Sequence, residues 1–314
     1  MPTHHLPATP ETMIWGTLSA DTPPVLRIDS GDTVSLACVP AGGAASFPAD
    51  LSRVPAAWRT AVETMTQGPG AHFVTGPVFV KGAMPGDVLQ VEILEAKPAM
   101  DFGFVSMAPL LGTLVGEFPD AETIHPPIDR AKGTCALPWG TELPLDPFFG
   151  VIGTAPPANW GKVSTNIPRS FGGNMDNKEL KPGTTLYLPV FAEGALFYAG
   201  DGHGVQGDGE VCVTAIETGL IGTFRLTVIN DLTLTWPRAE TPTHVMTMAF
   251  DPDLDDCVVI ALREMIGLIA ERTGLSRQRA YMLASLAADV RVTQVVNGSK
   301  GAHVMLPKSC LHRA

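Results

Sequence analysis

The chain has 314 residues, 45% of them hydrophobic, and its 32 acidic and 21 basic side chains give a net charge of -11. This length supports one large domain, or one domain with a smaller one, around a core that needs neither a disulfide nor a metal to fold. The negative charge argues against nucleic acid as a partner, because phosphates would meet a surface of the same sign.

The cysteines and the hydropathy pattern favour a soluble, cytoplasmic protein. The five cysteines are scattered and odd in number, with no C-x-x-C pair, which is typical of reduced thiols. The first residues lack the basic and apolar regions of a signal peptide. No stretch reaches the roughly 18 apolar residues that span a bilayer, so we expect no membrane partner.

Strand patterns dominate the first half of the chain. Residues 22–37 alternate polar and apolar side chains around Ser30-Gly31-Asp32, which predicts a β-hairpin. A short helix is expected within residues 55–65, and two further strands within 72–96 around a Pro85-Gly86 turn. Residues 101–155 lack periodicity and contain many prolines, which predicts irregular loops and short strands of the kind found at binding sites.

The second half continues with strands and then changes period. Residues 183–216 and 220–236 are rich in β-branched and aromatic side chains. Acidic residues at 251–256 precede a helical apolar pattern that stops at Gly274, and a second helix follows from Ser276 to about 288. A strand, an Asn-Gly turn and a strand close the chain. The sequence thus predicts an α+β, mainly β fold, with a β-sandwich core in residues 1–245 and a smaller C-terminal α/β subdomain in residues 246–314.

The chemistry is expected in residues 172–210, where acidic side chains and one histidine, His203, flank an apolar run. Glycines in this stretch let the backbone wrap closely around a small charged centre. Carboxylate and imidazole groups together indicate a metal site or an acid/base site. The acidic residues of the stretch are Asp176, Glu179, Glu193, Asp201, Asp208 and Glu210.

Residues 202–207 match the dinucleotide fingerprint G-x-G-x-x-G, but the context argues against it. Residues 207–216 have the pattern of a strand where the fingerprint needs a helix, and Asp208 and Glu210 would repel a pyrophosphate. In an extended segment, residues two apart share a face, so Asp201 can converge with His203 and Asp208 with Glu210. From spacing alone, a metal or catalytic site and a polar turn with solvated acids both remain open.

Several long motifs in the same order make the sequence resemble the acetamidase/formamidase family. They are GGNMD at 172–176, LYLPVFAEGALFYAGDGHGVQGDGEVC at 186–212, HFVTGPVFVKGAMPGDVLQVEI at 72–93, GVIGTAPP at 150–157 and AYMLASLAADVRVTQVVN at 280–297. One segment departs from the family, because DFGF at 101–104 stands where a tryptophan-bearing version is expected. This departure leaves the pocket wall, and with it the size of the substrate, open.

The resemblance implies a β-sandwich homo-oligomer that hydrolyses short-chain linear amides, such as formamide or acetamide, to ammonia and the carboxylate. It also implies a divalent metal, zinc by expectation, that activates water. Such an ion polarises a carbonyl and lowers the pKa of bound water to about 7. The expected metal ligands are Asp176, Asp201, His203 and His72.

The remaining candidate residues are assigned to catalysis. Glu210 or Asp208 is expected as the general base, and Asn174 as a hydrogen-bond donor to the developing oxyanion. Two other hypotheses stay open. One is a non-catalytic β-sandwich that binds a metal or a small ligand, and the other is a covalent amidase that uses Cys135 as its nucleophile.

Overall fold

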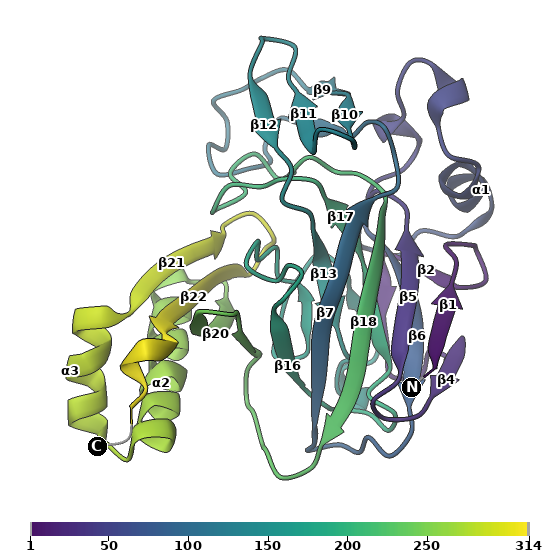
Figure 1. Cartoon of the computed structure of the whole chain (residues 1–314). Helices are drawn as coiled ribbons and strands as arrows, with labels where there is room; N and C mark the ends of the chain where they lie inside the picture. Colours follow the sequence, from purple (N-terminus) through teal and green to yellow (C-terminus); the bar gives the residue numbers. More distant parts are fainter. Residues whose placement is uncertain (1, 313–314) are drawn as a thin grey trace.

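A computed structural model describes residues 2–312, and it is built around two large β-sheets (Figure 1). The larger sheet has nine strands. Their spatial order is β1 (Thr3–Leu6), β5 (Thr33–Cys38), β18 (Leu220–Ile229), β7 (Val88–Pro98), β16 (Thr185–Pro189), β19 (Arg238–Glu240), β20 (His244–Asp251), β22 (Lys300–Pro307) and β21 (Asp289–Gln294). The mainly β, α+β class predicted from the sequence is confirmed.

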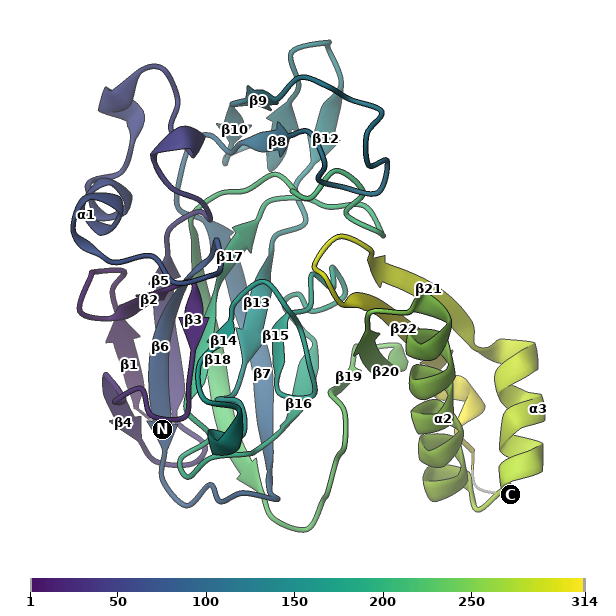
Figure 2. The ribbon, with the colours of Figure 1, turned by 180° about the vertical axis from the view of Figure 1, so that it is seen from behind.

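The smaller sheet has six strands and lies toward the viewer in Figure 2. Its strands are β15 (Gly172–Asn174), β13 (Phe148–Gly153), β17 (Phe197–His203), β6 (Phe73–Val80) and β2 (Met13–Trp15) in spatial order, with β4 (Leu26–Ile28) paired to β6. Every residue of β13 and β17 is buried. Polar side chains on these two strands therefore lie inside the protein.

Short elements complete the core region. One small sheet has three strands, β10 (Ile128–Asp129), β11 (Thr134–Ala136) and β12 (Glu142–Pro144). Two further sheets have two strands each: β3 (Thr17–Leu18) pairs with β14 (Val163–Ser164), and β8 (Val105–Met107) pairs with β9 (Glu122–Ile124). Helix α1 (Ala56–Thr64) lies where the sequence predicts a short helix. The 3-10 turns are η1 (Ala44–Ser46), η2 (Leu51–Arg53), η3 (Ala158–Trp160) and η4 (Lys308–Cys310).

The main hydrophobic core fills the space between the two sheets. In β5, buried and half-buried residues alternate, which is the period-two pattern of a strand with one face on a core. Its Val34 and Leu36 belong to the same buried cluster as Val78 of β6 and Phe197 of β17. This two-layer packing confirms the predicted sandwich.

Two local predictions are wrong. Strands form on both sides of the Ser30-Gly31-Asp32 turn, but β4 pairs with β6 and β5 pairs with β1 and β18, so they form no hairpin. Both strands bury side chains in the same inter-sheet core, which places them in opposite layers. Residues 204–219 form turns and loop instead of the predicted strand, because Glu210 and Val213 have φ angles of 44° and 89°.

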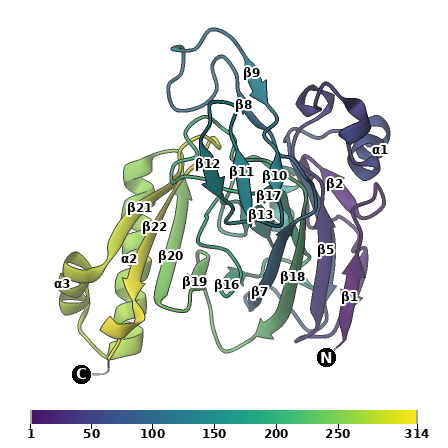
Figure 3. The ribbon, with the colours of Figure 1, turned by 45° about the horizontal axis from the view of Figure 1, so that its top comes forward.

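The C-terminal part extends the larger sheet and carries two helices on it. Strands β19, β20, β22 and β21 follow β16 across the sheet (Figure 3). Helix α2 (Leu254–Thr273) begins at Asp253, whose side chain accepts a hydrogen bond from Asp255 N, and ends at Gly274. Helix α3 (Arg277–Ala287) packs beside it in a shared hydrophobic cluster. The predicted boundary at residue 245 falls inside β20, and the division into domains stays a prediction.

Candidate active site

The site begins at the end of β17, where Asp201 and His203 lie on one buried strand. His203 Nε2 is 3.2 Å from Asp201 Oδ2, and both residues are at most 2% exposed. Asp201 has a φ of 57°, a left-handed conformation that few residues other than glycine adopt, although aspartate adopts it more often than most. Their side chains meet on one side of the strand, as the two-residue spacing predicts.

Asp176 approaches the same histidine from the segment that follows β15. Its Oδ1 atom is 3.9 Å from His203 Nδ1, and its φ is 46°. Asn297 Nδ2 donates to Asp176 Oδ2, and Gln206 Nε2 donates to the backbone oxygen of Asp176 at 2.8 Å. Two other segments of the chain thus hold Asp176 in place, one through its carboxylate and one through its backbone oxygen.

The loop 204–219 supplies two more buried carboxylates. Glu217 Oε1 lies 3.3 Å and Glu210 Oε1 lies 4.0 Å from His203 Nε2. The N–H of Ala215 donates to Glu217 Oε1 at 3.0 Å, which fixes that side chain within the loop. Glu217 was not among the predicted site residues, although it follows the acidic stretch by only seven positions.

Asp208 lies outside this centre, contrary to the expectation that it converges with Glu210. Its Oδ2 accepts hydrogen bonds from Arg291 Nε at 2.9 Å and Nη2 at 2.6 Å, and Lys178 Nζ is 3.3 Å from its Oδ1. The strand alternation on which the expectation rested is absent from residues 204–219 of the described chain. Glu210 therefore enters the site while Asp208 forms a partly exposed ion pair.

Gly150 of β13 allows the acidic side chains to close on His203. A Cβ atom at this position would overlap Asp176 Oδ1, and it would lie 2.5 Å from Asp201 Oδ2 and 2.7 Å from His203 Cε1. Real Cβ atoms keep more than 3.0 Å from such neighbours. The glycine in the GVIGTAPP motif is thus required by close approach.

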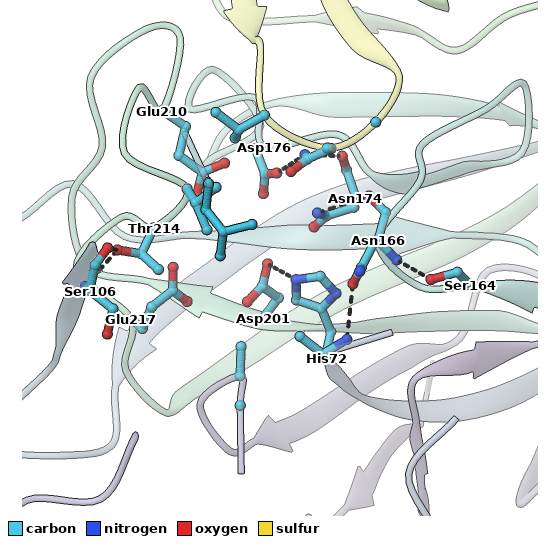
Figure 4. Close-up of a pocket in the computed structure, with 18 of the residues that line it drawn as sticks. His72, Ser106, Ser164, Asn166, Asn174, Asp176, Asp201, Glu210, Thr214 and Glu217 are labelled. Carbon is cyan, nitrogen blue, oxygen red and sulfur yellow. Dashed lines mark hydrogen bonds and ion pairs between the residues drawn. The ribbon is translucent and has the colours of Figure 1, made fainter. Parts of the chain in front are cut away.

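The carboxylates of Asp176, Asp201, Glu210 and Glu217 line a cavity of about 640 Å³ (Figure 4). His72 also lines it, with Nε2 3.8 Å from Asp201 Oδ2 and Nδ1 3.2 Å from the Thr165 hydroxyl. Asn174 lines it as well, and its Nδ2 donates to the backbone oxygen of Asn166 at 3.3 Å. The structure therefore brings together all the predicted site residues except Asp208.

Burial and neighbouring charges raise the pKa values of some side chains of the centre and lower that of Asp201. Burial raises the pKa of Glu217 to about 7, and burial, with the Asp176 carboxylate, raises the pKa of Glu210 well above its usual range. Burial also favours the protonated form of Asp201, but the two nearby histidines outweigh it and lower that pKa. Burial disfavours the charged form of His203, yet the carboxylates of Glu217 and Asp201 raise its pKa well above its usual value.

The donor set fits a divalent cation. Two sets of three side chains each place donor atoms within 4.8 Å of one another, and both contain His203: Asp176 with Glu210, and Asp201 with Glu217. Within residues 2–312, five buried atoms of these residues lack a hydrogen-bond partner, namely Asp176 Oδ1, Asp201 Oδ1, His203 Nδ1, Glu210 Oε2 and Glu217 Oε2. Buried polar atoms are normally satisfied, so this concentration marks a place where a cation would complete the bonding.

Cys135 lies apart from this centre. It packs in a small buried cluster with Ile128 and Ile216, and burial raises the pKa of its thiol. A nucleophilic cysteine needs a lowered pKa and access to substrate. The surroundings of Cys135 supply neither, so the covalent hypothesis loses its support.

The fold and the site define a β-sandwich protein with a buried carboxylate–histidine centre. The sequence pattern of the Acetamidase/Formamidase family matches residues 9–163 and 159–312. The chain therefore belongs to this family, and the resemblance noted in its motifs is confirmed.

Known proteins agree with this placement. An acetamidase from Bacillus halodurans is 34% identical in sequence to this chain. Its crystal structure matches the present one with a TM-score of 0.84, covering 96% of this chain and 97% of that one. The crystal structure of a predicted acetamidase/formamidase from Thermoanaerobacter tengcongensis, 29% identical in sequence, matches with a TM-score of 0.86, covering 99% of this chain and 98% of that one. An acetamidase of Mycolicibacterium smegmatis is 28% identical over 207 residues, which are 47% of this chain and 51% of that protein. The chain thus matches about half the length of this relative.

Within residues 2–312, no helix is both long enough and apolar enough to cross a membrane. The compartment and the oligomeric state of the protein stay predictions.

Proposed function

We propose that this protein is an amidohydrolase that converts short-chain linear amides, of the formamide and acetamide type, to ammonia and the carboxylate. The observation that carries the proposal is the convergence of four buried carboxylates on His203 at the wall of one cavity. An amide is a weak electrophile with a poor leaving group. Its hydrolysis therefore needs both carbonyl polarisation and proton transfer, which such a centre supports.

Asp201, His203 and Glu217 would hold a divalent cation, zinc in our proposal, with Asp176 on the other side of the His203 ring. When bound, such a cation polarises the amide carbonyl and makes water a better nucleophile near neutral pH. His72 Nε2 lies 3.8 Å from Asp201 Oδ2, within ion-pair distance, and would orient that carboxylate, since neighbouring side chains commonly position ligands. Asn297 would do the same for Asp176 through the hydrogen bond it donates.

Glu210 is the proposed general base. It is 6% exposed, lines the cavity, and has one carboxylate oxygen without a partner among the described residues. It would accept a proton from the attacking water and pass it to the nitrogen of the amide, which leaves as ammonia. The water oxygen and its second proton end in the carboxylic acid, which releases that proton to become the carboxylate product, so the atoms of the amide and the water are accounted for.

Asn174 is the proposed donor to the oxygen that becomes negatively charged as water adds to the carbonyl. One N–H of its amide points to Asn166, and a primary amide carries a second. A preorganised donor of this kind stabilises the developing charge most effectively in a site that excludes water.

The test is ammonia release by the purified chain from formamide, acetamide, propionamide and urea, with and without a chelator. We expect release from at least formamide or acetamide, and loss of that release after chelation. Bound metal without ammonia release from any amide would favour the alternative, a non-catalytic sandwich that binds a metal or small ligand.

A further inference from the structure

The cavity is much larger than formamide or acetamide. At about 30 Å³ per water molecule, its volume of about 640 Å³ corresponds to roughly twenty waters. Cavities in this range typically enclose ligands well above the size of acetamide, which has only four non-hydrogen atoms. A small amide at the carboxylates would leave most of this volume to solvent.

Apolar side chains form much of the remaining wall. Phe104, Ile167, Val213 and Val296 line the cavity, and Leu111, which is 55% exposed, lines it too. Phe104 belongs to a buried aromatic cluster with Trp58, 6.2 Å away between ring centroids and nearly parallel to it. This part of the wall is therefore firmly packed and suits hydrocarbon better than water.

The charges of the cavity exclude anionic substrates. Its titratable lining residues are His72 and the carboxylates of Asp176, Asp201, Glu210 and Glu217, and among its described lining residues there is no lysine or arginine. A carboxylate at the far end of the substrate, away from the proposed cation, would have no lysine or arginine as a partner, which is costly in a partly buried site.

Val213 lines the cavity in a strained backbone conformation. Its φ of 89° is an outlier for a β-branched residue, whereas glycine adopts this conformation freely. Its N–H donates to the backbone oxygen of Glu210 at 2.9 Å, so one turn carries both the proposed base and an apolar wall residue. This coupling places an apolar contact beside the proposed proton-transfer group.

We propose that the site takes neutral primary amides whose acyl chain is longer than acetyl and apolar, with Val213 and Val296 as specificity-determining residues. This inference rests on the proposed amide hydrolysis and extends its substrate range. Each methylene buried against an apolar wall favours binding by about fourfold. A linear chain of six carbons, as in hexanamide, would contact the apolar part of the cavity wall that acetamide is too short to reach.

The first test compares kcat/KM for ammonia release from formamide, acetamide, butyramide and hexanamide, together with the monoamide of adipic acid as an anionic counterpart of hexanamide. We expect kcat/KM at least tenfold higher for hexanamide than for acetamide, and at least tenfold lower for the adipic acid monoamide than for hexanamide. Either ratio below tenfold, with ammonia still released from small amides, overturns this inference and leaves amide hydrolysis standing. No ammonia from any of them overturns both.

The second test uses two changes in the wall and one control. Val296→Phe narrows the cavity and Val213→Gly removes an apolar contact, so each should lower the hexanamide-to-acetamide ratio of kcat/KM at least tenfold. Val290→Phe adds the same bulk on β21 at a position that is 47% exposed and outside the cavity, and the ratio should stay within twofold. An unchanged ratio in both wall variants overturns the assignment of these residues.

Discussion

His203 Nε2 lies 3.2 Å from Asp201 Oδ2, and the two residues stand on one buried strand with a single glycine between them. Around this pair, three other chain segments supply Asp176, the loop residues Glu210 and Glu217, and His72. The strand fixes the pair, and the loops bring the remaining carboxylates to it. This arrangement leads to predictions for metal binding, packing, pH dependence and the choice of nucleophile.

Asp201→Asn should weaken metal binding at least tenfold and lower ammonia release from acetamide at least a hundredfold. The change removes a buried charge that faces both His203 and His72. Metal content by elemental analysis and turnover are measured on the same sample. Asp208→Asn is the matched control, because Asp208 pairs with Arg291 outside the centre, and it should keep both properties within threefold. Equal losses of metal binding and ammonia release in the two variants would contradict the placement of Asp201 inside the centre and Asp208 outside it.

Gly150→Ala should displace the side chains of the carboxylate–histidine centre while leaving the surface of the protein unchanged. The new Cβ would lie 2.7 Å from His203 Cε1 and overlap the two nearest carboxylates, so a displacement of these groups is required. We expect a fall in stability of about 1–3 kcal/mol, typical of overpacking, together with loss of turnover. Gly267→Ala in α2 has open space around the new atom and should be neutral or slightly stabilising. Denaturant unfolding of both variants checks the contrast.

His303 should make the protein less stable as the pH falls below about 6.5. Burial, followed by the charge of Arg291, lowers its pKa to about 4, with Lys178 adding to the effect and Asp208 opposing it. As the pH falls, His303 therefore binds a proton in the unfolded chain before it does so in the folded protein. The stability that neutral His303 contributes is complete above pH 6.5 and is lost between pH 6.5 and 4. The loss reaches about 3 kcal/mol.

The measurement is the free energy of unfolding against pH for the unchanged protein and for His303→Asn. Asparagine keeps a hydrogen-bonding group near the Thr293 hydroxyl, which lies 2.7 Å from His303 Nδ1, but it does not titrate. The difference between the two curves should shrink as the pH falls from 6.5 to 4. A constant difference would show that His303 is not the group responsible.

Cys135→Ser should leave ammonia release within twofold of the unchanged protein. The thiol is fully buried beside Ile128 and Ile216, away from the carboxylates. A loss of more than a hundredfold with the fold intact by circular dichroism would restore the covalent hypothesis.

The parts of the fold that the sequence predicts are those with local causes. Helix α2 begins where Asp253 caps it and ends at Gly274, and both signals are readable within one turn of the helix. The proximity of Asp201 and His203 follows from the two-residue period of a strand. The predicted hairpin at residues 22–37 fails because the two strands pair with partners elsewhere in the chain, a choice made by burial in the inter-sheet core.

The rest of the site depends on contacts and backbone conformations that local patterns do not encode. Glu210 and Val213 adopt positive φ angles without being glycine, so their alternating pattern wrongly indicates a strand. Asn297 reaches Asp176 across 121 positions of the sequence. Glu217 has no special spacing from His203 and enters the site because the intervening loop turns back on it.

The most direct test of the proposed chemistry measures metal content and ammonia release from acetamide together, in the unchanged protein and in Glu210→Gln. Because Glu210 is proposed to move the proton and Asp201, His203 and Glu217 to hold the cation, we predict that the variant keeps at least half of the bound metal. Its turnover should fall at least a hundredfold. Undiminished turnover in Glu210→Gln, or turnover that survives complete removal of the metal by a chelator, would contradict the account.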